Sequence, residues 1–378
     1  MESYKNTSIR KTTWQKILNF IASTDKKTPY LLLDREVISD AAKKIGKGIK
    51  NSKTFYAVKA HPGKEVISFI EQTGVGFEVA SEGELAILKG LAVAPERIIS
   101  SNPVKTIPFL EEAGSYRVRL FAFDSIDEIE KIHAIIPDAS LYLRLSVPNE
   151  GSEWPLSRKF GVEPDVALDL IRYASERGMS VVGTTFHVGS QCNNIYNWQT
   201  ALDKVSNIWS EAEKTGVQMR ILNIGGGYPV KYRKDVPHIN EIESLIDGII
   251  RDRFPSDIEV HIEPGRAFVG EAGVFVTTVI GKAVRGDENW LYIDAGVFNG
   301  LMEAIGGIKY SYILGSRSEK KRWTIAGPSC DSLDVIDQDV LLPEPMVGDH
   351  LIIASAGAYT ISYASEFNGF PIPETILI

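Results

Sequence analysis

Residues 54–79 read TFYAVKAHPGKEVISFIEQTGVGFEV, and this stretch contains a complete strand–helix–strand unit. The runs Thr54–Val58 and Gly76–Val79 predict buried strands, because each is short, apolar and bounded by turn residues. Between them, Gly63–Thr73 carries apolar residues at helical spacing. The stretch therefore predicts one βα unit followed by the strand of the next.

The same alternation continues along the chain. The expected strands are Thr54–Val58, Gly76–Val79, Arg97–Ser100, Leu120–Phe123, Leu141–Leu145, Ser180–Phe186, Ile221–Ile224 and Glu259–Ile262. Expected helices include Gly63–Thr73, Gly83–Gly90, Ile126–Ala134, Asp165–Arg177 and Trp198–Lys214. Eight βα units close a parallel barrel, whereas a doubly wound sheet usually stops near about six strands and carries an early glycine-rich dinucleotide turn. The sequence therefore predicts an α/β fold with a (β/α)8 barrel of the TIM type.

The pattern changes after Arg266. Strands without long helices between them are expected at Val274–Ile280, Trp290–Ile293, Arg322–Ile325 and His350–Ala354, which predicts an all-β domain. The strand-like segment Pro29–Leu33 precedes the barrel and is expected to join that domain. We therefore expect an N-terminal extension over residues 1–27, helical around Trp14–Ala22, a strand of the β domain over 28–34, the barrel over 35–268 and the β domain over 269–378.

The composition excludes several classes of function. The chain has 41 basic and 49 acidic side chains, a net charge of −8, and lacks a Lys/Arg block, so no nucleic-acid partner is expected. It has no apolar run of the roughly 18 residues that a membrane helix needs, and Met1–Gln15 does not resemble a secretory signal. We expect a cytoplasmic protein with no membrane association. Its two cysteines, Cys192 and Cys330, are too few for a disulfide framework, and no metal site is expected.

Polar residues follow several expected strands at the C-terminal edge of the barrel, where barrel enzymes place their active sites. Lys59 ends the first strand, and a lysine there can be desolvated and brought close to neutrality, as imine formation with an aldehyde requires. His187 ends the sixth strand. Gly225–Gly227 follow the seventh and Glu263–Arg266 the eighth, and the loops at these two positions often bind phosphate. Each signal alone is also explained by a surface lysine, a structural histidine or a tight turn.

Together these residues form an ordered series of motifs. The motifs are YAVKA (56–60), HVGS (187–190), GGG (225–227), EPGR (263–266), CD (330–331) and GAYT (357–360), with WPLSRKFG (154–161) and FNGF (367–370). This series resembles the fold-type III decarboxylases that depend on pyridoxal 5'-phosphate (PLP), and ornithine decarboxylases in particular. The resemblance covers about residues 28–370. It implies an alanine-racemase-like barrel with a C-terminal β domain, PLP as cofactor, and decarboxylation of an L-α-amino acid of the ornithine or lysine type to its amine and CO2, as in polyamine biosynthesis.

The resemblance also implies roles for individual residues. Lys59 would bind PLP as an imine, Glu263 would keep the pyridine nitrogen protonated, and His187 would stack on the ring. Further cofactor contacts would be Glu78, Arg144, Ser190, Gly225, Gly226, Gly227, Gly265, Arg266 and Tyr359. Cys330 would return a proton to the α-carbon of the substrate. Cys330 and Asp331 would come from the neighbouring subunit of a homodimer with shared active sites.

The substrate-binding segment departs from the ornithine decarboxylase pattern. The expected substrate contacts are Asp331, Gly306, Gly307, Tyr310 and Phe367. Asp331 would bind the distal ammonium, but Gly306 and Gly307 stand about where a second acid is usual, and losing one charge-assisted hydrogen bond costs about 1.5–3 kcal/mol. Glu78 likewise stands where an aspartate is usual.

Three explanations for this departure stay open. Glu303 substitutes for the absent acid, or the pocket takes lysine or another diamino acid through water. In the third, the substrate is an aminocarboxypropyl-type group on a larger metabolite or modified peptide, as in antibiotic maturation, with Lys309 favouring an anionic group.

Other classes of protein fit less well. An amino-acid racemase of this fold would set an arginine, not Glu263, against the pyridine nitrogen. A non-catalytic homologue would be expected to lose Lys59 or the phosphate ligands. A zinc hydrolase would need more ligands at the mouth than His187.

Overall fold

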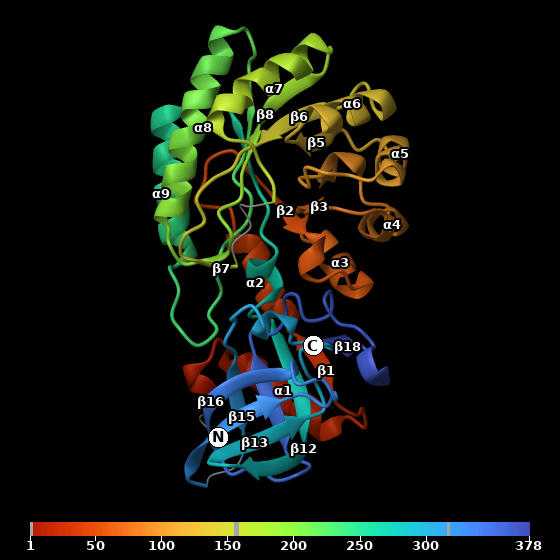
Figure 1. Ribbon diagram of the computed structural model, residues 1–378, viewed down its shortest axis with the longest axis vertical. Helices are drawn as coiled ribbons and strands as arrows, with labels where there is room; N and C mark the ends of the chain where they lie inside the picture. Colours follow the sequence, from red (N-terminus) through yellow and green to blue (C-terminus); the bar gives the residue numbers. More distant parts are fainter. Residues whose placement is uncertain (1–2, 155–158, 316–317) are drawn as a thin grey trace.

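The computed structural model describes residues 3–154, 159–315 and 318–378 and contains two domains stacked along the long axis of the molecule (Figure 1). The barrel and its helices occupy the upper part of that view, and the β domain occupies the lower part. Both ends of the chain are marked in the β domain. The chain therefore begins in the β domain, builds the barrel and returns.

Every expected barrel strand is present. The strands are β2 (Ser52–Ala57), β3 (Gly76–Glu78), β4 (Ile98–Ile99), β5 (Leu120–Phe123), β6 (Ser140–Arg144), β8 (Ser180–Thr185), β10 (Ile221–Asn223) and β11 (Glu259–Ile262). They form a parallel sheet in the order β4-β3-β2-β11-β10-β8-β6-β5. A parallel bridge between Ser100 and Phe121 joins the two outermost strands, so the sheet closes into the predicted barrel.

Helices separate most of the barrel strands. They are α2 (Arg35–Lys44), α3 (Lys64–Glu71), α4 (Glu82–Gly90), α5 (Ile107–Ser115), α6 (Ile126–Ile135), α7 (Pro164–Glu176), α8 (Tyr196–Lys214), α9 (Ile239–Arg253) and the short α10 (Arg266–Val269). Ser81, Thr106 and Ser125 cap α4, α5 and α6, each accepting a hydrogen bond from a backbone N–H in the first turn. Among the described residues, no helix combines the length and apolar character that crossing a bilayer requires.

The β domain is built on an eight-stranded sheet. Its strands are β1 (Tyr30–Leu33), β12 (Gly273–Arg285), β13 (Glu288–Ile293), β14 (Ser311–Leu314), β15 (Lys320–Ala326), β16 (Val335–Pro343), β17 (His350–Ala354) and β18 (Glu374–Leu377). β1 pairs antiparallel with β12, with Tyr30 opposite Val276, so the segment before the barrel joins this domain as expected. Two short strands, β7 (Ser152–Trp154) and β9 (Ser190–Cys192), pair separately. Single 3-10 turns are η1 (Ser3–Asn6), η2 (Val58–Ala60), η3 (Pro95–Arg97), η4 (Met302–Ala304) and η5 (Phe367–Gly369).

The N-terminal segment packs on the β domain. Its helix α1 (Lys11–Ser23) buries Trp14 and Ile17 in an apolar cluster with β1, β12, β14 and β17. Thr13 donates a 2.6 Å hydrogen bond from its hydroxyl to Asp34, which also caps α2 by accepting from Glu36 N. The segment expected as an extension therefore covers one face of the sheet.

Candidate active site

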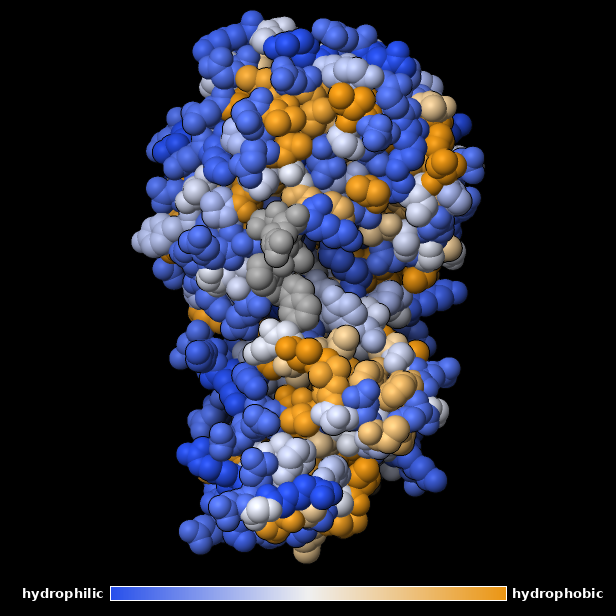
Figure 2. Space-filling view, viewed as in Figure 1, coloured by the Kyte–Doolittle hydropathy of each residue, from blue (hydrophilic) through white to orange (hydrophobic). Residues whose placement is uncertain are grey.

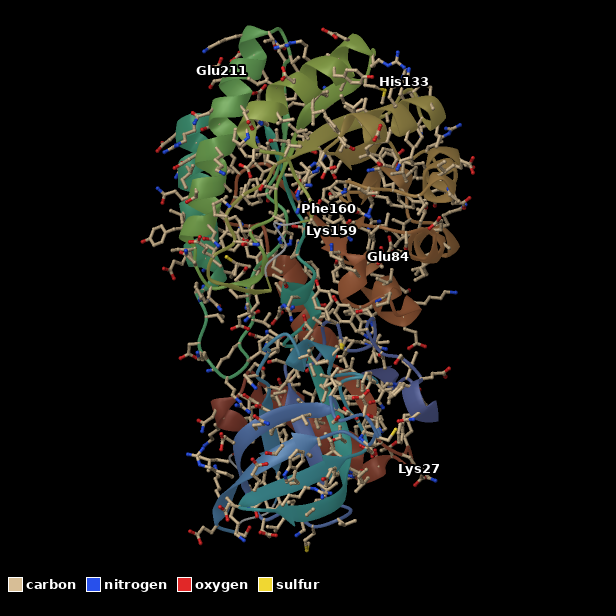
Figure 3. All side chains as sticks on the ribbon, in the orientation of Figure 1. Lys27, Glu84, His133, Lys159, Phe160 and Glu211 are labelled. Carbon is tan, nitrogen blue, oxygen red and sulfur yellow. The ribbon has the colours of Figure 1, made fainter. Side chains whose placement is uncertain are left out.

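A cavity of about 460 Å³ lies at the C-terminal ends of the barrel strands, where the barrel meets the β domain. The barrel contributes Lys59, Glu78, Ala80, Ser101, Asn102, Pro103, Arg144, Lys159, Phe160, His187, Ser190, Glu263 and Arg266, and the second domain contributes Glu303, Tyr359 and Tyr363. Figure 3 shows Lys159 and Phe160 in the middle of the molecule, at the end of the barrel nearest the β domain. Residues 155–158, which belong to the WPLSRKFG motif, lie outside the described residues.

Lys59 lies in the turn η2, directly after β2. Its Nζ is 3.2 Å from Oε2 of Glu78, the last residue of β3. The charge of this carboxylate raises the pKa of Lys59 above its ordinary value and outweighs the opposing effect of desolvation, and the Lys59 side chain is 48% exposed. The expectation of a nearly neutral lysine is therefore wrong for the cofactor-free chain, because the neighbouring strand supplies a carboxylate. A 2.7 Å hydrogen bond from Tyr359 N to Ala60 O ties the turn to the β domain.

Glu263 follows β11 and is 6% exposed. Its Oε1 accepts hydrogen bonds from the Ser101 hydroxyl and, at 2.5 Å, from Asn223 Nδ2. No hydrogen bond described for the chain ends on Oε2. Burial, with the nearby charge of Glu78, raises the pKa of Glu263. The cavity thus contains a buried carboxylate with one oxygen left for a ligand, an arrangement that suits a cationic N–H donor.

The glycine loop after β10 admits no side chain. A Cβ would lie 2.3 Å from Phe186 O at Gly225, 2.5 Å from Glu263 O at Gly226 and 2.6 Å from Gly189 O at Gly227. Bare backbone can therefore approach a ligand here. A second small cavity beside this loop is lined by Gly227, Gly265, Ser190, Arg266 and Tyr359, among others. The glycine backbone and the guanidinium of Arg266 in this lining suit a phosphate group.

His187 lies beside the same loop, two residues after the end of β8. Its Nδ1 accepts a 3.0 Å hydrogen bond from Gly189 N. Burial, together with the charges of Arg144 and Lys59, holds the pKa of His187 well below its ordinary value. The imidazole is therefore neutral, which suits a ring packed against another ring rather than a cationic role.

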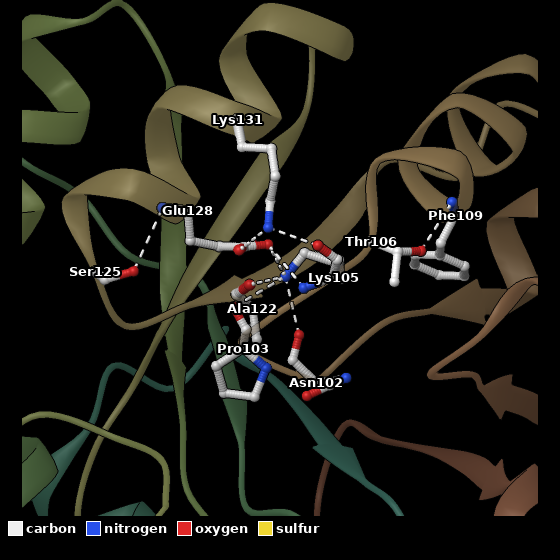
Figure 4. A network of polar contacts seen from close by, with 9 residues as sticks. All are labelled: Asn102, Pro103, Lys105, Thr106, Phe109, Ala122, Ser125, Glu128 and Lys131. Carbon is white, nitrogen blue, oxygen red and sulfur yellow. Dashed lines mark hydrogen bonds and ion pairs between the residues drawn. The ribbon is translucent and has the colours of Figure 1, made fainter.

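A buried network holds the loop after β4, which carries Ser101, Asn102 and Pro103 (Figure 4). The fully buried Lys105 Nζ donates to Ala122 O at 2.6 Å and Asn102 O at 2.9 Å. It also lies 2.9 Å from Glu128. Burial lowers the pKa of Lys105 to about 8. The network fixes one wall of the cavity and was not predicted from the sequence.

Glu84 is a further carboxylate near Lys59 that the sequence reasoning did not identify. Its Oε2 accepts a 2.7 Å hydrogen bond from Ala80 N, and its backbone N–H donates to Ser81 Oγ. Burial, with the charge of Glu78, raises the pKa of Glu84 to about 7. The residues Ser81 and Glu84 at the start of α4 have capping-box spacing, which is the one sequence signal that marks this position.

Several residues predicted to bind the substrate, and the predicted proton donor Cys330, are not among the residues that line the cavity. They are Gly306, Gly307, Tyr310, Cys330, Asp331 and Phe367. Gly306, Gly307, Cys330 and Asp331 are exposed, and Tyr310 is buried against Tyr232. Their roles stay predictions, since those of Cys330 and Asp331 require a neighbouring subunit. Conversely, Glu303, weighed above as a substitute acid, does line the cavity.

Comparison with known proteins identifies relatives over nearly the whole chain. Residues 35–270 match the sequence family described as "Pyridoxal-dependent decarboxylase, pyridoxal binding domain". The chain is 35% identical to a lysine/ornithine decarboxylase of Selenomonas ruminantium, over 93% of this chain and 89% of that protein.

Solved structures show the same fold. The chain superposes with a TM-score of 0.90 on a Vibrio vulnificus lysine/ornithine decarboxylase complexed with cadaverine, at 29% identity and covering 98% and 99% of the two chains. For the arginine decarboxylase of Paramecium bursaria Chlorella virus bound to agmatine, the TM-score is 0.91 at 27% identity, covering 96% and 100%. Other similar structures are PLP complexes.

Proposed function

This chain belongs to the pyridoxal-dependent amino-acid decarboxylases, and on that premise we propose that it converts a basic L-α-amino acid of the lysine or ornithine type to its diamine and CO2. The enzyme uses PLP, which when bound supplies an electron-accepting ring for the bond broken on loss of CO2. The observation that carries the proposal is the convergence of Lys59, Glu263 and the glycine loop on one cavity.

The residues of the cavity fit this cofactor. Lys59 supplies the primary amine that holds the aldehyde, and Glu263 offers its free Oε2 to the ring nitrogen. The neutral His187 provides a face for the ring. Gly227, Gly265, Ser190, Arg266 and Tyr359 line the small cavity that we assign to the phosphate, and Gly225 and Gly226 belong to the same glycine loop. We assign Arg144, which lines the cavity, to the ring side.

Proton movement at Lys59 follows from the charges around it. A lysine must be neutral before its nitrogen attacks an aldehyde, but Glu78 keeps Lys59 protonated. Oε2 of Glu78, 3.2 Å from Nζ, is the acceptor in reach of that proton. We therefore assign two roles to Glu78. Its charge stabilises the ammonium form of Lys59, and its Oε2 accepts the proton when the amine becomes neutral.

The substrate class rests on charge and on the relatives. We assign the distal ammonium of the substrate to Asp331 of the second subunit, because both oxygens of Glu303, which lines the cavity, accept hydrogen bonds from Arg266. Relatives that resemble this chain over most of its length are lysine/ornithine and arginine decarboxylases. A carboxylate that pairs with the distal ammonium of the substrate favours diamino acids over neutral amino acids.

A substrate panel tests this proposal. Release of CO2 from L-lysine, L-ornithine, L-arginine and L-leucine is measured with the PLP-loaded enzyme, and turnover is expected with lysine or ornithine. Lys59→Ala should abolish turnover, whereas Lys64→Ala, an exposed lysine at the start of α3, should leave it unchanged. Turnover of none of the basic amino acids would contradict the proposal.

The exposed Cys330 loop supports a homodimer with shared sites. Cys330 donates from its backbone N and its Sγ to Asn368 Oδ1, at 3.1 and 3.3 Å, which holds the thiol at the surface. Two exposed apolar side chains lie close by: Leu333 is three residues after Cys330, and Phe367 precedes Asn368, the hydrogen-bond partner of Cys330. Figure 2 shows apolar residues gathered on the face of the β domain next to the barrel. We propose that a second copy covers this region and receives Cys330 as proton donor to the α-carbon.

Mixing two inactive variants tests the shared site. Lys59→Ala and Cys330→Ala homodimers should each be impaired, and refolding them together should restore up to about one quarter of wild-type activity, because each mixed dimer has one intact site. No recovery, with mixed dimers demonstrated by mass, would show that each subunit carries a complete site.

The conjugated-substrate alternative gains no support. Gly306 and Gly307 are exposed and are not among the residues that line the cavity, and Lys309 pairs with Asp337 at 3.0 Å. Glu303 stands in the cavity wall instead. The free amino acid is therefore the simpler substrate.

A further inference from the structure

Arg266 donates all five of its N–H groups within the protein. Its Nε and Nη2 donate to Ser190 Oγ at 3.3 and 3.0 Å, and Nη1 donates to the Tyr232 hydroxyl. The remaining two bonds go to Glu303, from Nη1 at 2.7 Å and from Nη2 at 2.6 Å. A guanidinium has five N–H donors, so none is left for a further anion.

The partner of this arginine is a buried carboxylate from the other domain. Glu303 lies in η4 of the second domain, and the side chains of Glu303 and Arg266 are each 4% exposed. The bond is bidentate, the strongest geometry for this pair. The Tyr359 ring also lies 4.8 Å from the guanidinium carbon.

The pair stands beside the small cavity assigned to the phosphate. Arg266 and Ser190 line both this cavity and the larger one, whereas Glu303 lines only the larger one. A phosphate placed against Gly227 and Ser190 would therefore contact the guanidinium of Arg266, whose positive charge is already balanced by Glu303 outside this small cavity. Glu303 and a phosphate would share one cation at close range in a site largely shielded from water, where like charges repel strongly.

We propose that Glu303 competes with the phosphate of the cofactor for Arg266, and so sets how tightly this enzyme holds PLP. The proposal rests on the assignment of the small cavity to the phosphate. A phosphate can take an N–H of Arg266 from Ser190, from Tyr232 or from Glu303, and whichever bond it replaces, the negative charge of Glu303 opposes its binding to the shared guanidinium. Glu303 thus acts on the cofactor through Arg266 and is a positioning residue.

The test compares ligands with and without phosphate. Purified cofactor-free wild type and Glu303→Gln are titrated with PLP by absorbance, with pyridoxal, which lacks the phosphate, and with inorganic phosphate by calorimetry. Because glutamine is neutral, Glu303→Gln should bind PLP and phosphate at least about tenfold tighter. Pyridoxal affinity should not change. Glu344→Gln, a surface variant with the same change in net charge, should match wild type for all three ligands.

The outcomes separate clearly. Equal or weaker PLP binding by Glu303→Gln overturns the proposal, as does an equal gain for pyridoxal, which would place the effect outside the phosphate site. Glu303→Ala is the second variant, and it should show the same order of affinities. If either Glu303 variant folds only in the presence of phosphate, the result supports the competition, because phosphate then replaces the Glu303 carboxylate as the anion beside Arg266. A variant that stays unfolded with phosphate overturns it. No substrate is added, so a failure of the decarboxylation proposal would not affect the result.

Discussion

Replacing Glu84 with glutamine should stabilise the cofactor-free protein at alkaline pH and have little effect in acid. In the folded chain the pKa of Glu84 is about 7, against an ordinary value of 4.5. Folding thus favours the protonated form of Glu84. Its contribution to the free energy of unfolding is complete below pH 4.5 and is lost as the pH rises through 7. The difference corresponds to at most about 3 kcal/mol, so we expect Glu84→Gln to gain roughly 1–3 kcal/mol near pH 8 and under about 0.5 kcal/mol near pH 4.5.

Urea unfolding at the two pH values measures this change. Glutamine can still accept the hydrogen bond from Ala80 N, so the substitution isolates the charge. Glu82→Gln in the same helical turn is the matched control, because burial hardly affects Glu82 and its hydrogen bond from Thr106 lowers its pKa. That control should gain nothing near pH 8. A Glu84→Gln effect that is equal at both pH values, or destabilising in alkali, would refute the reasoning.

Three other perturbations test a buried ion pair beside the site, the glycine loop and the packing of α1 on the β domain. Lys105→Met should lower the free energy of unfolding by roughly 2–4 kcal/mol by leaving Glu128 buried without this partner, and adding Glu128→Gln should recover part of it in urea unfolding. Gly226→Ala should weaken PLP binding more than about tenfold in absorbance titrations, since a Cβ there meets backbone, whereas Gly248→Ala in α9 meets nothing and should leave affinity unchanged. Trp14→Ala should cost about 3 kcal/mol without altering PLP affinity, and an unchanged unfolding midpoint would contradict the packing of α1.

Local sequence patterns predicted the barrel well. The strands Leu120–Phe123 and Glu259–Ile262 begin and end where expected. The strands β14, β16 and β18 were missed, because short β-domain strands lack a helix to separate them and pair with partners distant in the chain. The helices α2, α5 and α9 were also not among those predicted.

Residues at strand ends were predictable for a related reason. Lys59, His187 and Glu263 each follow a barrel strand, and parallel strands bring their C-terminal ends to one edge. Ser101 and Asn223, which hold Glu263, were missed because a serine or asparagine beside a strand carries no distinctive pattern. Their role appears only once the carboxylate is seen beside them.

The sequence by itself determined the eight barrel strands in their order and the positions of Lys59, His187 and Glu263 at the barrel mouth, because hydrophobic periodicity is local and a parallel barrel brings the ends of its strands to one edge. Only the tertiary structure decided the charge states at this mouth. Lys59 is an ammonium because Glu78 of the next strand lies beside it, and Arg266 is balanced by Glu303 from the other domain. Electrostatic energy depends on distance and burial, and neither is determined until segments far apart in the chain have packed together.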